Sequence, residues 1–474
     1  MLTGSGTTAV YHAGVLRALH EAGVKVDLTA GRGAGVVGAM LAAVDGGARL
    51  WDPDGIWKGK GAARFYGWRD PLRVAGWILA AAGAILAVPL VLLVVAVAVA
   101  FIGLLLTLVG LAAAATTLTV GYAGWIAGIF SPPMLPTVIP RLALFALLVA
   151  LLTLLIGPLR SILSKRPQRR SRQAFAGRVL AGPLSPAGVS DRCAAELWNL
   201  IRGAAPIPTP PRVELGRRYL ELLADNLGQP GFRELLITVH DMDARRDLVF
   251  ALLAPRLRPR FFSRAPASGS RAAGSSSVPA AALDLADGDN RQAEAFDLAG
   301  TARDHVLDAM DAALALPVAV DPHLLTFAPE GPWRGETHRV CDRPGGLARL
   351  LEEVAAAGAE QVILVSGSPP PAQPHQLSAG RGDLRGRAGE QLAAFESATL
   401  RDALEQFTGR FSGLFVIRPA HNPLGPLDFG GAYDERSDRT HTLGELLDRG
   451  YEDAYRQFIE PVVGAGGEKM ARMS

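Results

Sequence analysis

The feature that most constrains this chain is a long stretch without charge. No charged residue or histidine occurs from Val74 to Pro140, and a second such run extends from Leu142 to Leu159 after the single Arg141. A bilayer core is spanned by about 20 apolar residues, and one charge at its centre costs about 2.5–3.5 kcal/mol. A buried helical hairpin in a large soluble core is the alternative. The length of the run predicts a transmembrane segment.

Basic residues flank this apolar block on both sides: Lys58, Lys60, Arg64, Arg69 and Arg73 before it, and Arg160, Lys165, Arg166, Arg169, Arg170 and Arg172 after it. The positive-inside rule then places both flanks in the cytoplasm, which requires an even number of spans. We expect a kinked span within Trp77–Val109, with Pro89 inside it, and a return span at Leu142–Leu159. Residues Gly110–Pro140 would form a connecting loop with interfacial pieces.

The basic flanks and the cysteine content indicate the surroundings of the chain. With a formal net charge of only +3, the clustered cations suit anionic lipid headgroups better than nucleic acid. Met1–Gly6 lacks the pattern of a signal peptide, and two cysteines give no disulfide framework. We expect an integral membrane protein with a cytoplasmic soluble domain, no cofactor, and protein partners that the sequence does not identify.

The soluble parts alternate strand-like and helix-like segments, which is typical of an α/β sheet. We expect residues 1–70 to form the first part of one domain, 71–165 the transmembrane insertion, and 166–474 the remainder. Low-complexity composition predicts loops at about 264–292 and 369–387. Strands are expected at 26–30, 362–367 and 413–419 and as a hairpin around Arg245 and Arg246, and helices at 34–44, 192–202, 212–227, 301–316, 347–357, 391–407 and 443–462.

The segment "VDLTAGRGAGVVGAML", Val26–Leu41, reads as a short strand, a glycine-rich turn and a helix. This is the frame of a nucleophile elbow, in which Gly-Xaa-Ser-Xaa-Gly holds a serine on a strained strand-to-helix corner. The central position here is Gly33. Glycine tolerates the backbone of such a corner, but it carries no attacking oxygen.

Three segments together resemble the patatin-like phospholipase family: "GSGTTAVYHAGVLRALHEAGVKVD" from Gly4, the "GRGAG" turn, and "CDRPGGLARLLEEVAAAGAEQVILV" from Cys341. The strand pair in "ELLITVHDMDARRDLVF" is similar as well. The resemblance implies a patatin-like sheet flanked by helices, interrupted by the transmembrane insertion. It also implies lipid acyl hydrolysis by a serine–aspartate dyad, and it places the segments before and after the insertion in one compartment.

Carried over by position, the resemblance assigns the oxyanion loop to Gly4, Ser5, Gly6, Thr7 and Thr8. Thr8 and Ala9 stand where the family usually has a basic residue and a glycine, and "DRPGG" replaces the tight Asp-Gly-Gly of the family. Gly33 occupies the nucleophile position and Asp342 the dyad aspartate position. Without its partner, Asp342 could instead be a loop carboxylate that caps the following helix.

These residues leave three functions open. The first is a degenerate acyl hydrolase that binds membrane phospholipid or a fatty acyl ligand, with Arg32 and the glycine-rich turns holding a phosphate or carboxylate. Arg32 could equally be a solvated surface residue. The second is an active lipid acyl hydrolase with a relocated nucleophile, for which Ser5, Thr7, Thr8, Ser366 and Ser368 are the nearby hydroxyls. None of these five residues lies within a Gly-Xaa-Ser-Xaa-Gly frame.

The third function is dinucleotide binding, because "GSGTTA" fits a weak form of that fingerprint and Asp27 lies about where a ribose carboxylate would. Two other features lie near the C-terminus. Asp428, followed by Gly430 and Gly431, is a second candidate for the dyad aspartate, but a charged turn is the favoured interpretation. His421 and His441 are interpreted as isolated, and no spacing resembles a metal site.

Overall fold

The computed structural model describes residues 1–59, 61–163, 182–264, 291–372, 380 and 382–464. The chain forms two compact units, one containing Met1–Gly67 and Leu184–Ser474 and the other containing Trp68–Pro167. Within the described residues, the chain leaves the first unit after Gly67 and rejoins it at Leu184. The loop predicted at 264–292 lies almost wholly outside the described residues, whereas helix α14 (Leu384–Phe407) begins inside the loop predicted at 369–387.

A nine-stranded sheet forms the centre of the first unit. Its main path runs β5-β4-β3-β2-β1-β8-β9, and β7 pairs with both β3 and β6. The bounds are β1 (Leu2–Thr3), β2 (Leu28–Arg32), β3 (Glu234–Asp241), β4 (Arg246–Leu252), β5 (Ala295–Asp297), β6 (His323–Thr326), β7 (Thr337–Cys341), β8 (Gln361–Ser366) and β9 (Gly413–Ile417). Strands β3, β2, β1, β8 and β9 are mutually parallel. The predicted α/β class is confirmed.

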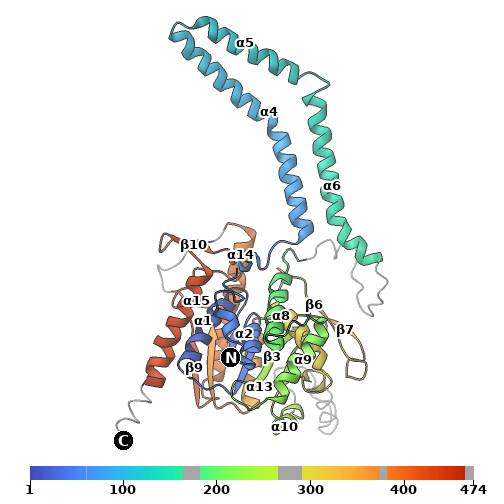
Figure 1. Cartoon of the computed structure of the whole chain (residues 1–474), viewed down its shortest axis with the longest axis vertical. Coiled ribbons are helices and arrows are strands. Elements are labelled where there is room, and N and C mark those ends of the chain that lie inside the picture. The colour runs from blue at the N-terminus through green and yellow to red at the C-terminus, as the bar shows by residue number, and fades with distance from the viewer. Residues whose placement is uncertain (60, 164–181, 265–290, 373–379, 381, 465–474) are drawn as a thin grey trace, which may run out of the picture. The chain divides into compact units, whose positions relative to one another are not determined.

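Helices cover both faces of this sheet (Figure 1). Successive side chains of β3 point to opposite faces, so Leu235 and Ile237 enter one core and Leu236 enters the other. The first core is shared by α1 (Thr8–Glu21), α2 (Gly35–Ala43), α8 (Ala187–Arg202), α9 (Arg212–Asp225), α12 (Val306–Leu314) and α15 (Leu443–Ala454). The second is shared by α13 (Gly346–Ala356) and α14.

The "HAGVL" segment of α1 has a packing role. A Cβ at Gly14 would lie 1.9 Å from the carbonyl oxygen of Leu447, and a Cβ at Gly450 would lie 2.3 Å from that of Tyr11. Helices α1 and α15 therefore cross at backbone contact, which glycine alone allows on either side. The predicted helix 443–462 is present as α15 followed by π-helical turns at Tyr455–Gly464.

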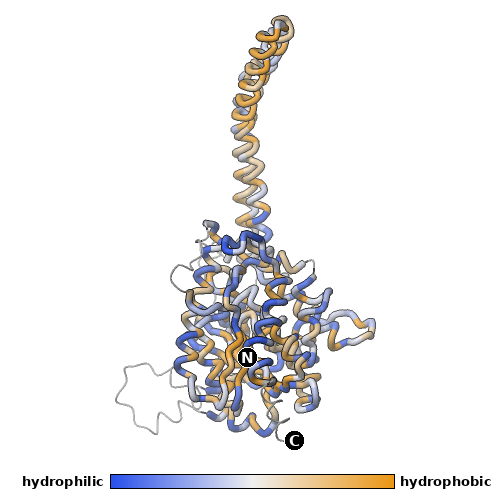
Figure 2. The backbone as a smooth tube through the Cα atoms, turned by 90° about the vertical axis from the view of Figure 1, so that its left-hand side faces the viewer, coloured by the Kyte–Doolittle hydropathy of each residue, from blue (hydrophilic) through white to orange (hydrophobic). Residues whose placement is uncertain are grey.

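The second unit consists of α4 (Asp70–Leu108), α5 (Ala112–Ile129) and α6 (Leu135–Leu163). All three are long and apolar enough to cross a membrane, and Figure 2 shows apolar residues along most of their length. The loop predicted at Gly110–Pro140 is wrong, because α5 occupies most of it. Its threonines satisfy their hydroxyls on carbonyls of the preceding turn, as Thr116 does on Ala112, so they do not break the helix.

Helix α4 packs against both α5 and α6. Its 39 residues extend about 58 Å at 1.5 Å per residue, which is twice a bilayer core. Near its far end, Gly103 faces Thr119 so closely that a Cβ there would lie 2.8 Å from the threonine methyl carbon. Tyr122 donates to the carbonyl of Leu92 at 2.6 Å. The unit is thus a hairpin with α4 as one arm and α5 followed by α6 as the other.

The sheet of the first unit limits how this hairpin can cross a bilayer. Strand β2, which precedes the insertion, pairs in parallel with β3, which follows it, over the register Leu28↔Glu234 to Arg32↔Thr238. Strands of one sheet lie in one aqueous compartment, so both ends of the insertion leave from the same side. Three complete crossings are incompatible with this pairing, and the helices must make an even number.

This parity gives a first prediction. Single cysteines introduced at exposed Asp54, before the insertion, and at exposed Asp225, after it, should react with an impermeant maleimide from the same side of sealed membranes. The native Cys193 and Cys341 are both buried and should give little background. Labelling of the two positions from opposite sides would contradict the shared sheet.

Candidate functional site

The residues assigned by the resemblance gather at the carboxyl ends of the parallel strands. Strand β1 ends at Thr3 and leads through Gly4–Thr7 into α1, and β2 ends at Arg32 and leads through Gly33 into α2. In open α/β sheets, ligands bind outside the carboxyl ends of strands where the strand order reverses. Here the chain proceeds from β1 toward β2 and β3 on one side and places β8 on the other, so the two glycine turns lie at that point.

Gly33 has the backbone of a sharp strand-to-helix corner. Its φ is +55°, in the left-handed region that favours glycine, and the following Ala34 N–H donates to the carbonyl of Gly4 at 2.9 Å. A Cβ at Gly33 would lie 2.5 Å from the Gly4 oxygen and 2.8 Å from Asp342 Oδ2. The corner is therefore present, but the space for a side chain on it is filled.

Asp342 is brought to this corner by strand β7. Cys341 at the end of β7 pairs with His240 of β3, and the next residue, Asp342, is 1% exposed. The sequence left open that Asp342 caps the following helix. That alternative is wrong, because α13 has no side-chain cap and the Asp342 carboxylate bonds elsewhere.

The Asp342 carboxylate is held by Arg32. Arg32 Nε lies 3.2 Å from Oδ1 and Nη2 lies 3.0 Å from Oδ2, a bidentate pair. The other edge of the guanidinium contacts Glu396, with Nη2 2.6 Å from Oε1 and Nη1 2.8 Å from Oε2. Nη1 also donates to Thr3 Oγ1 at 3.1 Å. Arg32 is 1% exposed, so its interpretation as a solvated surface residue is wrong.

We call Arg32, Asp342 and Glu396 the buried ion triad. Ser5 lies beside it and contacts both of its carboxylates. Its Oγ lies 2.8 Å from Glu396 Oε1 and 3.2 Å from Asp342 Oδ2. Ser5 is also 1% exposed. The hydroxyl therefore serves as an internal hydrogen-bond donor to the two carboxylates.

Electrostatics within the triad follow from burial and pairing. Burial acts to lower the pKa of Arg32, but the adjacent Asp342 and Glu396 carboxylates outweigh it and raise that pKa. Burial, reinforced by the charge of Asp342 and opposed by Arg32, raises the pKa of Glu396 above its ordinary value. The Arg32 guanidinium thus faces two buried carboxylates, and burial makes Glu396 resist ionisation.

The Gly4–Thr8 loop, to which the resemblance assigned an oxyanion role, is covered by another part of the chain. Thr7 N–H donates to the carbonyl of Pro426 at 3.0 Å, and Thr7 Oγ1 donates to that of Gly425 at 2.8 Å. A Cβ at Gly6 would lie 1.7 Å from the Pro426 oxygen. The covering turn is fixed by Asp428, whose Oδ2 accepts from Gly425 N–H at 2.8 Å. Asp428 thus takes part in a turn, as the favoured interpretation expected.

Thr8 closes the remaining gap beside this loop. Its side chain packs so tightly that a Cβ at Gly4 would lie 2.6 Å away, and a Cβ at Gly367 would lie 2.7 Å away. Ser366 and Ser368 sit just across, where Ser366 Oγ accepts from Ser368 N–H at 3.2 Å. No hydrogen bond joins either serine to Asp342 or to a histidine within the described part of the chain.

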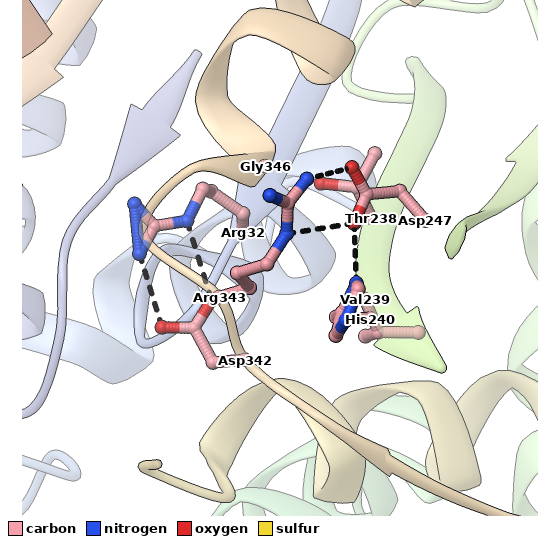
Figure 3. Close-up of a pocket in the computed structure, with 8 residues that line it drawn as sticks. All are labelled: Arg32, Thr238, Val239, His240, Asp247, Asp342, Arg343 and Gly346. Atoms are coloured by element: carbon pink, nitrogen blue, oxygen red, sulfur yellow. Dashed lines mark hydrogen bonds and ion pairs between the residues drawn. The ribbon is translucent and has the colours of Figure 1, made fainter. Parts of the chain in front are cut away.

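A small pocket adjoins the triad, as Figure 3 shows. It is a shallow depression lined by Arg32, Thr238, Val239, His240, Asp247, Asp342, Arg343 and Gly346. His240 Nδ1 lies 2.8 Å from Asp247 Oδ1, and Arg343 pairs with the same carboxylate. Burial acts to raise the pKa of Asp247, but the hydrogen bonds from His240 and Arg343 outweigh it and lower the pKa.

The pocket residues on β3 and β4, and Glu396, were missed in the sequence. The hairpin register pairs His240 directly with Asp247. Their symmetric spacing about a turn centred on Asp243 and Ala244 is the signal that would have found them. Glu396 interrupts a stripe of buried residues at four-residue spacing on α14, Leu392, Glu396 and Leu400. A carboxylate in such a stripe needs a buried partner.

Dinucleotide binding is contradicted by the position of Asp27. The residue is exposed and precedes β2, where its carbonyl accepts from Glu234 N–H at 3.0 Å. The Gly4–Thr7 turn lies at the carboxyl end of β1, which is parallel to β2. Asp27 therefore lies at the amino end of its strand, whereas the glycine turn lies at the carboxyl end of the neighbouring parallel strand. Asp27 cannot reach a ribose bound at that turn.

Comparisons with models of protein families, with curated proteins and with solved structures give no match to this chain. Among the residues that the structure describes, no group of three or more histidine, cysteine, aspartate or glutamate side chains is arranged to hold a metal ion. The site is thus characterised by its geometry alone: a strand-to-helix corner at Gly33 with no space for a side chain, an aspartate paired with arginine, and a glycine loop covered by the 425–426 turn.

The buried ion triad predicts a large effect on stability. Arg32→Met leaves two buried carboxylates without a cation, so the free energy of unfolding should fall by about 3–5 kcal/mol. Arg401→Met is the matched control, because Arg401 pairs with Asp402 on the surface and both side chains are at least 60% exposed. Its cost should stay below about 1 kcal/mol. Equal denaturant midpoints for the two variants would refute a structural role for the triad.

The raised pKa of Glu396 predicts a dependence of stability on pH. The unfolded chain loses this proton near the ordinary value of 4.5, while the folded chain keeps it to higher pH. Folded protein therefore binds more protons in that window, and the stability due to this group falls as pH rises through the folded pKa. In thermal unfolding from pH 4.5 to 8, wild type should lose stability relative to Glu396→Gln. Parallel curves would contradict the assignment.

Proposed function

We propose that this chain is a membrane-anchored, degenerate member of the patatin-like phospholipase family, which associates with lipid and does not cleave lipid esters at its elbow. The proposal rests on the sequence resemblance, the α/β sheet, and the three apolar helices. Its cytoplasmic orientation is part of the proposal and rests on the basic flanks. Within this family the elbow would have carried an acyl-enzyme, which requires a nucleophile.

One observation carries the proposal: the volume for a side chain at Gly33 is occupied by the Gly4 carbonyl oxygen and the Asp342 carboxylate. A hydrolase of this type needs a hydroxyl at that point, with the aspartate free to receive its proton. Here Asp342 instead accepts hydrogen bonds from Arg32 and Ser5. The Asp342 carboxylate, which would act as the base in such a hydrolase, therefore has a structural role at the end of the sheet.

The geometry also changes where lipid would bind. Arg32 was a candidate for holding a phosphate or carboxylate, but its five N–H groups all face protein acceptors. The Thr7 N–H is likewise committed to Pro426. Lipid association is therefore assigned to the apolar helices, and to basic side chains such as Lys58, Arg64 and Arg73 that can attract anionic headgroups.

A relocated nucleophile remains the second candidate because of one contact. Ser5 Oγ lies 3.2 Å from Asp342 Oδ2, which is close to hydrogen-bond reach for a serine–aspartate pair. For Ser5 to attack a lipid ester, the 425–426 turn would have to leave the glycine loop and Asp342 would have to leave Arg32. Loss of activity in Ser5→Ala, with Ser366→Ala unchanged, would favour this candidate.

Restoring the missing serine distinguishes the proposals. Gly33→Ser should not gain phospholipid hydrolysis, measured as free fatty acid by mass spectrometry, and it should lower stability by about 1–3 kcal/mol or more. Gly23→Ser is the matched control: Gly23 has φ +67° but nothing within 4 Å of its Cβ position, so it reports backbone strain alone.

Two results would overturn the proposal. One is lipid ester turnover by purified wild type that disappears in Ser5→Ala. The other is a Gly33→Ser variant that is as stable as Gly23→Ser and hydrolyses phospholipid, because that outcome would mean the nucleophile space is open.

A further inference from the structure

A second cluster of chemically competent side chains lies far from the elbow in sequence, in the hairpin of β10 (Ala432–Asp434) and β11 (Arg439–His441) and the start of α15. The sequence interpretation treated His421 and His441 as isolated. That interpretation is wrong, because both lie against the Asp434 carboxylate, with Nε2 to Oδ2 distances of 3.3 and 3.6 Å.

Three of these side chains stand in the order of a catalytic triad. Ser437 Oγ lies 2.8 Å from His441 Nε2, and His441 Nδ1 lies 2.6 Å from Glu445 Oε2. An ionised carboxylate only accepts hydrogen bonds, so in the neutral ring Glu445 fixes the proton on Nδ1. The lone pair of Nε2 then faces the serine hydroxyl, which is the arrangement of nucleophile, general base and orienting carboxylate.

The local fold holds the three groups in place. His441 pairs with Ala432 across the hairpin and its side chain is 5% exposed. Thr442 caps α15 by accepting from Glu445 N–H, which sets Glu445 in the first turn, four residues after His441. Ser437 lies in the turn between the strands and is exposed, in contrast to the buried Ser5.

Asp434 competes for the serine proton, since its Oδ2 lies 3.0 Å from Ser437 Oγ. The same oxygen can accept from His421 Nε2, and Oδ1 accepts from Arg436 N–H at 3.2 Å. Burial acts to raise the pKa of Asp434, but these donors and Ser437 outweigh it and lower the pKa. Because Asp434 has donors other than Ser437, the Ser437 hydroxyl can turn from Asp434 Oδ2 to His441 Nε2 without leaving that carboxylate unpaired.

We propose that Ser437, His441 and Glu445 form a serine esterase site for carboxylic esters that reach this exposed hairpin, separate from the elbow. Ser437 Oγ forms a bond to the acyl carbon while His441 Nε2 takes its proton. The imidazolium then gives that proton to the departing alkoxide as the acyl C–O bond breaks. Water, deprotonated by the same nitrogen, attacks the acyl-serine. The bond between the acyl carbon and Ser437 Oγ then breaks, His441 returns the proton to Oγ, and the carboxylic acid is released. The Arg436 guanidinium, with Nη1 3.4 Å from His421 Nδ1, brings positive charge to this turn.

The site uses no residue of the buried ion triad, so it neither requires nor excludes a silent elbow. The groups facing His441 are Asp434, Ser437 and Glu445, with Arg439 Nη2 3.8 Å from the Glu445 carboxylate. Glu445 acts through His441 and is a positioning residue. Its effect should appear in how the rate depends on pH as well as in the rate itself.

The test treats full-length protein in detergent with a fluorophosphonate probe and maps the modified residue by peptide mass spectrometry. Wild type should be labelled at Ser437, and Ser437→Ala should remove that label. Ser412→Ala is the matched control: Ser412 is also exposed but donates to the carbonyl of Glu360 and contacts no histidine. Hydrolysis of p-nitrophenyl butyrate should disappear in Ser437→Ala and persist in Ser412→Ala.

The histidine and glutamate variants separate catalysis from structure. His441→Gln should slow labelling by at least about 100-fold. Glu445→Gln should slow it by at least about tenfold and displace the rise of the rate with pH, which a merely structural change would leave in place. Absence of label on Ser437 in folded wild type, or labelling that His441→Gln leaves unchanged, would overturn the proposal. Labelling at Ser5 and not at Ser437 would refute both this proposal and the proposal that no ester is cleaved at the Gly33 corner.

Discussion

The end of the central sheet depends on one buried cation. Arg32 is the last residue of β2, and its guanidinium joins Asp342, which follows β7, to Glu396 in the middle of α14. Ion pairs out of water are stabilising only when nearly every polar atom is satisfied. The surrounding hydroxyls of Thr3 and Ser5 meet that condition here. Strand, loop and helix from three distant parts of the chain therefore meet at a single side chain.

The glycine at position 33 and this ion triad belong to one arrangement. A side chain at Gly33 would occupy the space now taken by Asp342 Oδ2 and by the Gly4 carbonyl oxygen. With only hydrogen there, the carboxylate can approach the corner and accept from Arg32, whose backbone directly precedes it. The absence of a side chain at position 33 and the structural use of Asp342 are thus mutually consistent.

How much the sequence could predict depends on the range of the interactions involved. The strand and helix around Gly33, the β3–β4 hairpin and the helix after Thr442 follow from local periodicity and turn residues, and all are present. Helix α5 was missed because glycine and proline around it suggested a loop, whereas packing against α4 through Gly103 and Tyr122 decided the outcome. The role of Glu396 and the cover of Thr7 by Pro426 rest on contacts across more than 360 residues, which no local pattern encodes.

The insertion itself bears on how such a sheet can form. The β2–β3 pairing joins Leu28 to Glu234, and closing so long a flexible loop carries an entropic cost that grows with its length. The hairpin changes this, because α4 packs along α6 and brings the start and end of the insertion near each other. Among the described elements outside the hairpin, the helices α2, α3 (Ala48–Trp51), α8 and α9 lie between β2 and β3 in the chain. Packing of α4 against α6 therefore favours the pairing of β2 with β3, so the apolar helices contribute to the fold of the sheet.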